Sequence, residues 1–245
     1  MEPVFYKEYF AAEKHHWWSK VRRNLICQLL SKYLSGRFEG TRILDYGCGS
    51  GYLVGQLQKT GYRAYGEDIS QEAIEFGQKQ GIGNLSVSRG SEINFAGNSF
   101  KTVLALDVIE HIKDDQFVFK EIERVLKPGG IAIITVPAYQ WLWGVQDDIA
   151  HHYRRYTAGS LAKVLNENTN LQILRKTYFN TFLFPSIAVV RILSKWFNLK
   201  GRESDFDINN KWLNNLFFYI FDLERRFLKG INFPFGVSIL LIAKK

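Results

Sequence analysis

The feature that most constrains this chain is a stretch with glycine at three alternate positions, Asp45-Tyr46-Gly47-Cys48-Gly49-Ser50-Gly51. The apolar residues before it predict a buried strand that ends near Asp45, and the residues after Gly51 predict a helix. Glycine lacks a Cβ, so the backbone can turn sharply and approach a ligand closely. A strand, a glycine loop and a helix in this order are typical of a nucleotide-type site at the carboxyl end of a parallel strand.

The spacing of the glycines indicates which ligand to expect. A dinucleotide-binding G-x-G-x-x-G loop would need glycine where the chain has Tyr52, and the G-x-x-x-x-G-K-[ST] phosphate loop is also absent. The chain instead has acid-x-G-x-G-x-G, which resembles the first motif of the class I S-adenosylmethionine-dependent methyltransferases. The resemblance implies S-adenosyl-L-methionine as cofactor and S-adenosyl-L-homocysteine as product, bound by Asp45, Gly47, Gly49 and Gly51. An acid beside the glycines suits a positively charged donor.

Further apolar segments follow the glycine loop, separated by helical patterns and turn residues, at 62–67, 84–88, 103–107 and 131–136. This βα alternation predicts an α/β fold with a doubly wound, mostly parallel sheet. The order of motifs over 41–138 resembles the same methyltransferase class. In that class the strands expected at 171–179 and 237–244 would form a closing hairpin of a seven-stranded sheet.

The last two expected strands are far apart in this sequence. The residues between them are strongly apolar, helical in pattern and much more numerous than a hairpin loop requires. No uninterrupted apolar run there is long enough to span a bilayer. We therefore predict a methyltransferase core at 1–180 with an N-terminal lid segment at 1–35, an inserted apolar helical cap at 181–235, and the last core strand at 236–245.

An acid at the end of a second parallel strand can accept hydrogen bonds from both hydroxyls of a ribose. The resemblance selects Asp68, since the family pattern is Gly-x-Asp-x-Ser, with Glu67 as the fallback. It places Ile69 and, at the end of the fourth strand, Asp107 in the same donor pocket. After the third strand the family usually has an aspartate where this chain has Ser91, so Glu92 is the candidate for the adenine contact.

The N-terminal segment contains an adjacent pair of tryptophans, which are costly to leave in water. We expect Trp17 and Trp18 to cover the cofactor pocket, with Arg22 or Arg23 meeting the methionine carboxylate, so Trp18 and Arg23 are candidate cofactor-binding residues. Plain packing of this segment against the core is the alternative.

Methyl transfer to oxygen needs a base with a pKa near neutrality, which indicates histidine. A polar cluster at 142–157 follows the fifth strand, and it resembles a largely uncharacterised bacterial branch of the class with a Leu-Trp, Asp and His-x-Arg-Arg-Tyr series. On this resemblance His152 is the family's histidine and Asp147 its acid, both candidate catalytic residues, and we expect His152 to act as the general base. The substrate-binding candidates are Arg154 and Arg155, which suit an anionic group, together with Tyr156 and Trp143. A solvated basic turn is the alternative.

Glu110 and His111 form a competing site. They resemble the Glu-His of the ubiquinone-pathway O-methyltransferases, where the acid can help to hold a divalent metal. Two adjacent ligands are too few for a metal site, so we expect no metal and expect His111 to line the donor pocket as a candidate catalytic residue. A quinone or aromatic O-methyltransferase that uses Glu110 and His111 is an alternative function.

Charge is distributed unevenly. Residues 146–245 contain 15 Lys and Arg against 8 Asp and Glu, whereas the whole chain has a net charge of +8. This basic, apolar C-terminal part suggests a small-molecule or lipid-linked acceptor and leaves open peripheral contact with a membrane. The Asp-Val-Ile-Glu-His after the fourth strand differs from the Asn/Asp-Pro-Pro-Tyr of amino-methylating DNA enzymes, so no nucleic-acid partner is expected. The sequence leaves the oligomeric state open.

The location follows from two simpler features. Two cysteines give no disulfide framework, and the N-terminus shows no apolar signal-peptide pattern. We therefore expect a cytoplasmic protein, with contact to the inner membrane face as an open alternative. A non-catalytic S-adenosylmethionine-binding partner protein is the second functional hypothesis.

Overall fold

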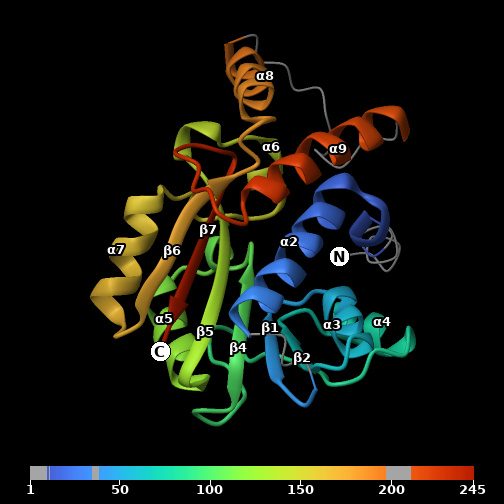
Figure 1. The fold of residues 1–245 in the computed structure, drawn as a ribbon, viewed down its shortest axis with the longest axis vertical. Coiled ribbons are helices and arrows are strands. Elements are labelled where there is room, and N and C mark those ends of the chain that lie inside the picture. The colour runs from blue at the N-terminus through green and yellow to red at the C-terminus, as the bar shows by residue number, and fades with distance from the viewer. Residues whose placement is uncertain (1–9, 11, 35–38, 197–210) are drawn as a thin grey trace.

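The computed structural model describes residues 10, 12–34, 39–196 and 211–245, which form a seven-stranded sheet with helices on both faces (Figure 1). The strands are β1 (Arg42–Tyr46), β2 (Arg63–Asp68), β3 (Leu85–Val87), β4 (Phe100–Leu106), β5 (Leu126–Pro137), β6 (Gln172–Phe179) and β7 (Ser238–Lys244). The helices are α2 (Trp17–Tyr33), α3 (Tyr52–Lys59), α4 (Gln71–Lys79), α5 (Asp115–Val125), α6 (Val145–Ile149), α7 (Ala158–Asn168), α8 (Phe184–Trp196) and α9 (Lys211–Phe227), with 3₁₀ turns η1 (Ile109–His111) and η2 (Gln140–Leu142).

The sheet has the strand order β3-β2-β1-β4-β5-β7-β6. Strands β1 to β5 pair in parallel, and β7 runs antiparallel to both β5 and β6. The predicted mostly parallel, doubly wound sheet with a closing hairpin is therefore confirmed. Two strands begin earlier than predicted, β4 at Phe100 rather than Val103 and β5 at Leu126 rather than Ile131. The Lys-Pro-Gly-Gly stretch is taken into β5 through a register shift opposite Phe100 and Thr102.

Alternate strand residues face two separate cores. In β4, Leu104 and Leu106 belong to the core shared with α2, α3, α4 and α9, whereas Val103 and Ala105 face the core under α5 and α7. A strand covered on both faces buries every side chain, which explains the nearly continuous apolar runs in the sequence. Ser70 and Thr157 accept hydrogen bonds from Ala73 N and Ser160 N and begin α4 and α7, as their sequence positions predict.

The carboxyl ends of β1, β4 and β5 lie together along one side of the sheet, across the ends of its strands, and we call this side the carboxyl edge. The inserted segment lies at the same edge. Strand β6 runs parallel to β5, so it ends there at Phe179, and the antiparallel β7 begins there at Ser238. Helices α8 and α9 accordingly stand at this end of the molecule (Figure 1). The described part of the insertion is helical, as its sequence pattern predicts, whereas residues 197–210 of the insertion and residues 1–9, 11 and 35 of the lid segment lie outside the described residues. Among the helices that the structure describes, none is both long and apolar enough to cross a bilayer.

Candidate active site

The glycine loop joins β1 to α3 at this edge. Gly47 N and Cys48 N both donate to Glu67 O, at 2.7 and 3.0 Å, which fixes the loop against β2. Gly47 and Gly51 have φ of +74°, and a Cβ on Gly47 would lie 2.2 Å from Val108 Cγ2. On Gly51 a Cβ would lie 2.6 Å from Leu85 Cδ2. These two glycines are therefore required by the turn and by internal packing, in addition to the close ligand approach expected from the sequence.

The two acids at the end of β2 face opposite sides of the sheet, as neighbouring strand residues must. Asp68 faces the glycine loop, where its carboxylate accepts from Gly49 N at 2.7 Å and from Ser70 N at 2.9 Å. Glu67 is fully buried on the other side and accepts from Asn94 N at 3.3 Å. This geometry favours Asp68 over Glu67 for the ribose. The neighbouring Ile69 is 74% exposed and lies open to solvent.

Three carboxyls and one guanidinium gather around the loop. Burial raises the pKa of Asp45 to about 7, partly offset by Arg22, and the acids Glu13 and Asp68 raise it further. Burial also raises the pKa of Glu13 to about 7. Carboxyls held close together in a buried place are stabilised in their charged form by a cation. An ammonium or a sulfonium group therefore fits this cluster, which agrees with the ligand implied by the glycine motif.

Glu13 had no signal in the sequence, yet it brings the N-terminal segment onto the glycine loop. Its Oε2 accepts from Ser50 Oγ at 2.8 Å, and its backbone O accepts from Arg23 Nη1 at 2.9 Å. The Arg23 guanidinium lies 5.0 Å from the centre of the Tyr52 ring. Residues from both segments line a small pocket there, namely Glu13, Ser19, Arg22, Arg23, Tyr52, Leu53 and Leu106. This arrangement supports the predicted lid position of the segment.

The tryptophan pair lies beside this pocket and not among its lining residues. Trp18 stacks on Phe179 and Phe221, with ring centres 5.6 and 5.3 Å away, and Trp17 meets Phe221 edge-on. Both contacts tie α2 to α9 and to the end of β6. This is the packing alternative named from the sequence, and contact of Trp18 with the donor stays a prediction. Glu92 is exposed after β3, and its adenine contact also stays a prediction.

The exit from β4 carries two acids, of which Asp107 is partly exposed and Glu110 is buried. Asp107 has φ of +57°, pairs with Arg22 of α2, and accepts from Thr135 Oγ1 at 3.1 Å. Arg22, rather than Arg23, thus reaches this strand end. Glu110 in η1 is fully buried, and neither carboxylate oxygen has a hydrogen-bond partner in the structure. Burial, together with the nearby charge of Asp107, raises the pKa of Glu110 well above its usual value.

The segment after β5 brings Asp147 and His152 together. Asp147 Oδ1 lies 2.8 Å from His152 Nδ1, and the carboxylate also accepts from Arg155 Nε at 2.7 Å and Nη2 at 2.9 Å. Burial alone would raise the pKa of Asp147, but the bonds from His152 and Arg155 outweigh it and hold the pKa well below its usual value. An ionised acid at Nδ1 favours the imidazole tautomer with a proton there, which leaves a lone pair on Nε2.

The expected substrate-binding residues are occupied by contacts within this segment and with Asp115 of α5. Arg155 is committed to Asp147, and Arg154 pairs with Asp115 at 2.9 Å. Tyr156 Oη donates to the same Asp115 at 2.7 Å, and Trp143 Nε1 donates to Asp148 Oδ1 at 2.9 Å. These contacts brace the loop that holds His152. Direct binding of the acceptor by the four residues stays a prediction.

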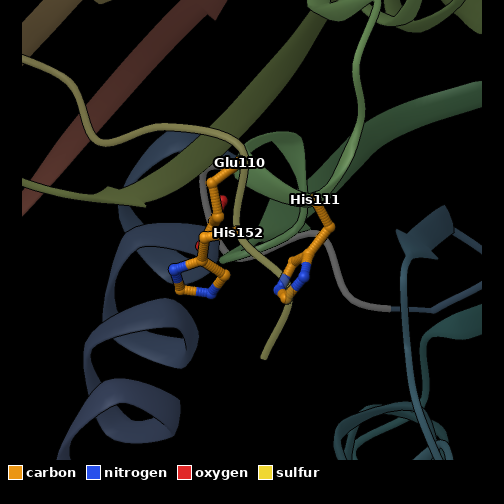
Figure 2. A group of neighbouring side chains, drawn as sticks. All are labelled: Glu110, His111 and His152. Carbon is orange, nitrogen blue, oxygen red and sulfur yellow. The ribbon is translucent and has the colours of Figure 1, made fainter. Parts of the chain in front are cut away.

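His152 also lies against the competing Glu-His site. Its ring is 4.5 Å from that of His111 and nearly perpendicular to it, and Figure 2 shows the two imidazoles side by side near Glu110. Burial and the neighbouring His152 lower the pKa of His111. One donor atom from each of Glu110, His111 and His152 lies within 4.8 Å of the others. The fold thus adds a third donor to the two adjacent ones, so these are the residues that could hold a divalent ion, and the expected absence of a metal stays a prediction.

The fold is a Rossmann-like α/β fold, and the glycine loop at its strand ends has the geometry and charge that suit a nucleoside ligand with a positive group. Residues 44–134 match the family model described as "Methyltransferase domain". The ubiquinone biosynthesis O-methyltransferase of Mesorhizobium japonicum (strain LMG 29417 / CECT 9101 / MAFF 303099) is 32% identical over 103 residues, covering 40% of this chain and 41% of the relative. The chain thus spans about two fifths of the length of the curated relatives it matches first.

Solved structures extend the likeness of fold beyond that segment. A SAM-dependent methyltransferase from Archaeoglobus fulgidus superposes with a TM-score of 0.59 at 18% identity, covering 97% of this chain and 99% of that one. The phosphoethanolamine N-methyltransferase 2 of Haemonchus contortus, in complex with S-adenosyl-L-methionine, gives 0.55 at 19% identity over 88% and 52% of the two chains. The family match over residues 44–134 and these superpositions agree on the fold of the class I S-adenosylmethionine-dependent methyltransferases.

Proposed function

We propose that this chain transfers the methyl group of S-adenosylmethionine to a hydroxyl oxygen of a small-molecule or lipid-linked acceptor, with His152 as general base. The observation that carries the proposal is the Asp147–His152 pair, which leaves Nε2 with a lone pair next to the exit of β4. The donor side is supported by the carboxyl cluster of Glu13, Asp45 and Asp68 at the glycine loop. The O-methyltransferase names of the first relatives support oxygen as the acceptor atom.

The chain's residues would divide the work as follows. When bound, S-adenosylmethionine supplies a methyl group already activated by positive sulfur. His152 Nε2 takes the proton of the acceptor hydroxyl as the oxygen–carbon bond forms and the sulfur–carbon bond breaks, with the electron pair returning to sulfur. Asp147 stabilises the imidazolium, and Arg155 holds Asp147 ionised and in place. The proton then passes from His152 to solvent.

An aromatic hydroxyl acceptor is the second candidate, with Glu110 and His111 lining its site. The names of the ubiquinone-pathway relatives and the packing of His111 against His152 favour it. With such an acceptor, His111 and His152 would contact the edge of its aromatic ring. Either His152 or His111 would then act as the general base. Turnover of the single variants His111→Ala and His152→Ala distinguishes the two arrangements, because the variant that lacks the general base should lose the most turnover.

Methyl transfer is tested by calorimetry with S-adenosylmethionine and S-adenosylhomocysteine, followed by incubation with a ¹³C-methyl donor. Polyhydroxylated aromatics and a total bacterial lipid extract serve as acceptors. We expect both nucleosides to bind and the label to appear at an O-methyl carbon shift in one acceptor class. Binding without label in any acceptor would support the non-catalytic binding protein, and no binding would remove the proposal.

A further inference from the structure

Helix α9 (Lys211–Phe227) is amphipathic, and its apolar side is wider than the part that is buried against the rest of the protein. One face packs on α2, where Phe221 is fully buried and rests on Trp17 and Trp18. The rest of the apolar side carries Leu216, Tyr219, Leu223 and Phe227, at steps of three and four residues. Their exposed fractions are 38%, 70%, 48% and 45%. Together with Trp212, which is 67% exposed, they form a continuous row that we call the α9 stripe.

Helix α8 (Phe184–Trp196) exposes a second apolar group from the same insertion. Val189, Val190 and Trp196 are 54%, 55% and 81% exposed. Single exposed apolar residues are ordinary on protein surfaces, but a contiguous set indicates an interaction site. Large aromatic side chains are also the residues that settle at the boundary between lipid and water. The composition of the two helices therefore suits a bilayer surface.

The charges beside the α9 stripe have one sign. Lys211, Arg226 and Lys229 are exposed at its two ends, and the side chain of Arg226 is 70% exposed. The two acids of the helix do not offset them in solvent, because Glu224 is fully buried and Asp222 is 13% exposed in its pairs with Arg225 and Arg226. An apolar row flanked by basic residues is complementary to an apolar surface with anionic headgroups.

Hydrogen bonds at both ends of α9 hold the helix to the rest of the protein. Glu224 accepts from Thr181 N at 2.7 Å and from Phe182 N at 2.8 Å, directly after β6. Asn214 Oδ1 accepts from Trp17 N at 2.9 Å, at the start of α2. Helix α2 in turn sends Arg22 to Asp107 beside the candidate active site. The stripe therefore stands at the sheet edge that carries the glycine loop, one helix away from the site.

We infer that the α9 stripe docks on an anionic lipid bilayer and holds the carboxyl edge of the sheet against it. This extends the proposed function by its acceptor class, since an acceptor delivered from that surface carries a lipid portion. The binding itself does not depend on methyl transfer. If a second copy of the chain or another protein binds the stripe instead, the experiment below shows it.

The test is flotation of the full chain with phosphatidylcholine vesicles, with and without phosphatidylglycerol. We expect flotation with the anionic vesicles, loss of most of it at high salt, and little with neutral ones. The variant Leu216→Ser/Leu223→Ser should lower the partition coefficient at least tenfold. Its matched control is Phe117→Ser/Leu174→Ser, because those side chains are 39% and 41% exposed outside the insertion. Circular dichroism and melting curves establish that both variants fold.

Three results would overturn the inference. They are no flotation of the unaltered chain, equal flotation of the stripe variant and its control, and a dimer in solution that the stripe variant dissociates. Calorimetry with S-adenosylhomocysteine is run on the same samples, and the stripe variant should bind it as the unaltered chain does. Vesicle binding without nucleoside binding would remove the proposed function and leave the docking inference standing.

Discussion

Ser50 Oγ donates a hydrogen bond to Glu13 Oε2 over 2.8 Å, and this contact fixes the N-terminal segment to the glycine loop. Glu13 also meets Arg23 through its backbone oxygen. The donor pocket is thereby closed on one side by a segment that lies outside the sheet. If that segment is a lid, weakening its contact with the glycine loop should lower the affinity for the donor.

The variant Glu13→Ala is expected to bind S-adenosylhomocysteine about tenfold more weakly, or ~1.4 kcal/mol, because a hydrogen bond from the loop and a carboxyl facing the donor's ammonium are lost. Isothermal titration calorimetry measures the change. Glu75→Ala is the control, since Glu75 is exposed on α4 and accepts a hydrogen bond from Gln71 of the same helix, away from the glycine loop. An unchanged dissociation constant for Glu13→Ala would argue that the segment is only packing.

The ligand-free protein should lose stability as pH rises through the range around pH 4 to 7. Burial raises the pKa of Asp45 and of Glu13 to about 7 in the folded chain, with Arg22 opposing and Asp68 reinforcing the shift of Asp45. The folded state then binds more protons than the unfolded state in that window, so the free energy of unfolding falls with increasing pH. Melting temperatures across the range measure it. Asp45→Asn should flatten the profile, and a profile as steep as the original would refute the assignment to Asp45.

His152→Ala should lower turnover by about 10²–10⁴-fold while leaving the affinity for S-adenosylhomocysteine unchanged, as expected for loss of a general base. His151→Ala is a matched control, because His151 is the adjacent histidine and is exposed. Steady-state kinetics and calorimetry together provide the readout. Full turnover in His152→Ala would exclude its role as the base.

Asp147→Ala should destabilise the fold by about 3–5 kcal/mol, because it leaves the guanidinium of Arg155, only 8% exposed, without its partner. In a chain of this size that corresponds to a fall in melting temperature of about 10 °C. Asp148→Ala removes the neighbouring exposed acid and only its solvent-exposed bond from Trp143, so it should lower the melting temperature much less. Equal effects of the two substitutions would mean that the Asp147–Arg155 pair is not a structural support.

Removal of metal should leave turnover unchanged, since the proposed base is a metal-free imidazole. Added Zn²⁺ should inhibit, because Glu110, His111 and His152 have donor atoms within 4.8 Å of one another and Zn²⁺ would take the lone pair on His152 Nε2. A chelator should restore activity. Loss of turnover after dialysis against a chelator, with recovery on adding a divalent ion, would instead make the cluster a working metal centre.

The sheet could be predicted from the sequence because its signals are local. Apolar runs, the glycines after Asp45, and caps such as Ser70 and Thr157 each act within a few residues. Asp68 could be chosen by its place in the chain, and the strand geometry explains why Glu67 faces away.

Contacts between distant segments could not be predicted in this way. Nothing near Trp18 in the sequence indicates that it stacks on Phe221, and nothing near Glu13 indicates Ser50. The sequence predicts that Arg155 binds an acceptor, and it gives no sign that Arg155 pairs with Asp147 instead. Which of them pair depends on the path of the loop after β5, which places the carboxylate against both Arg155 and His152.

The register Phe179↔Ser238 gives the inserted helices a further consequence for how this chain can evolve. Both ends of the insertion sit side by side on paired strands, so its length and content can change without moving a strand or disturbing the donor loop. Helix α9 nevertheless covers Trp17 and Trp18, two hundred positions earlier. A chimera that carries a different insertion should therefore fold only if Trp17 and Trp18 are changed to match it. Among natural relatives, the insertion and the N-terminal segment should vary together.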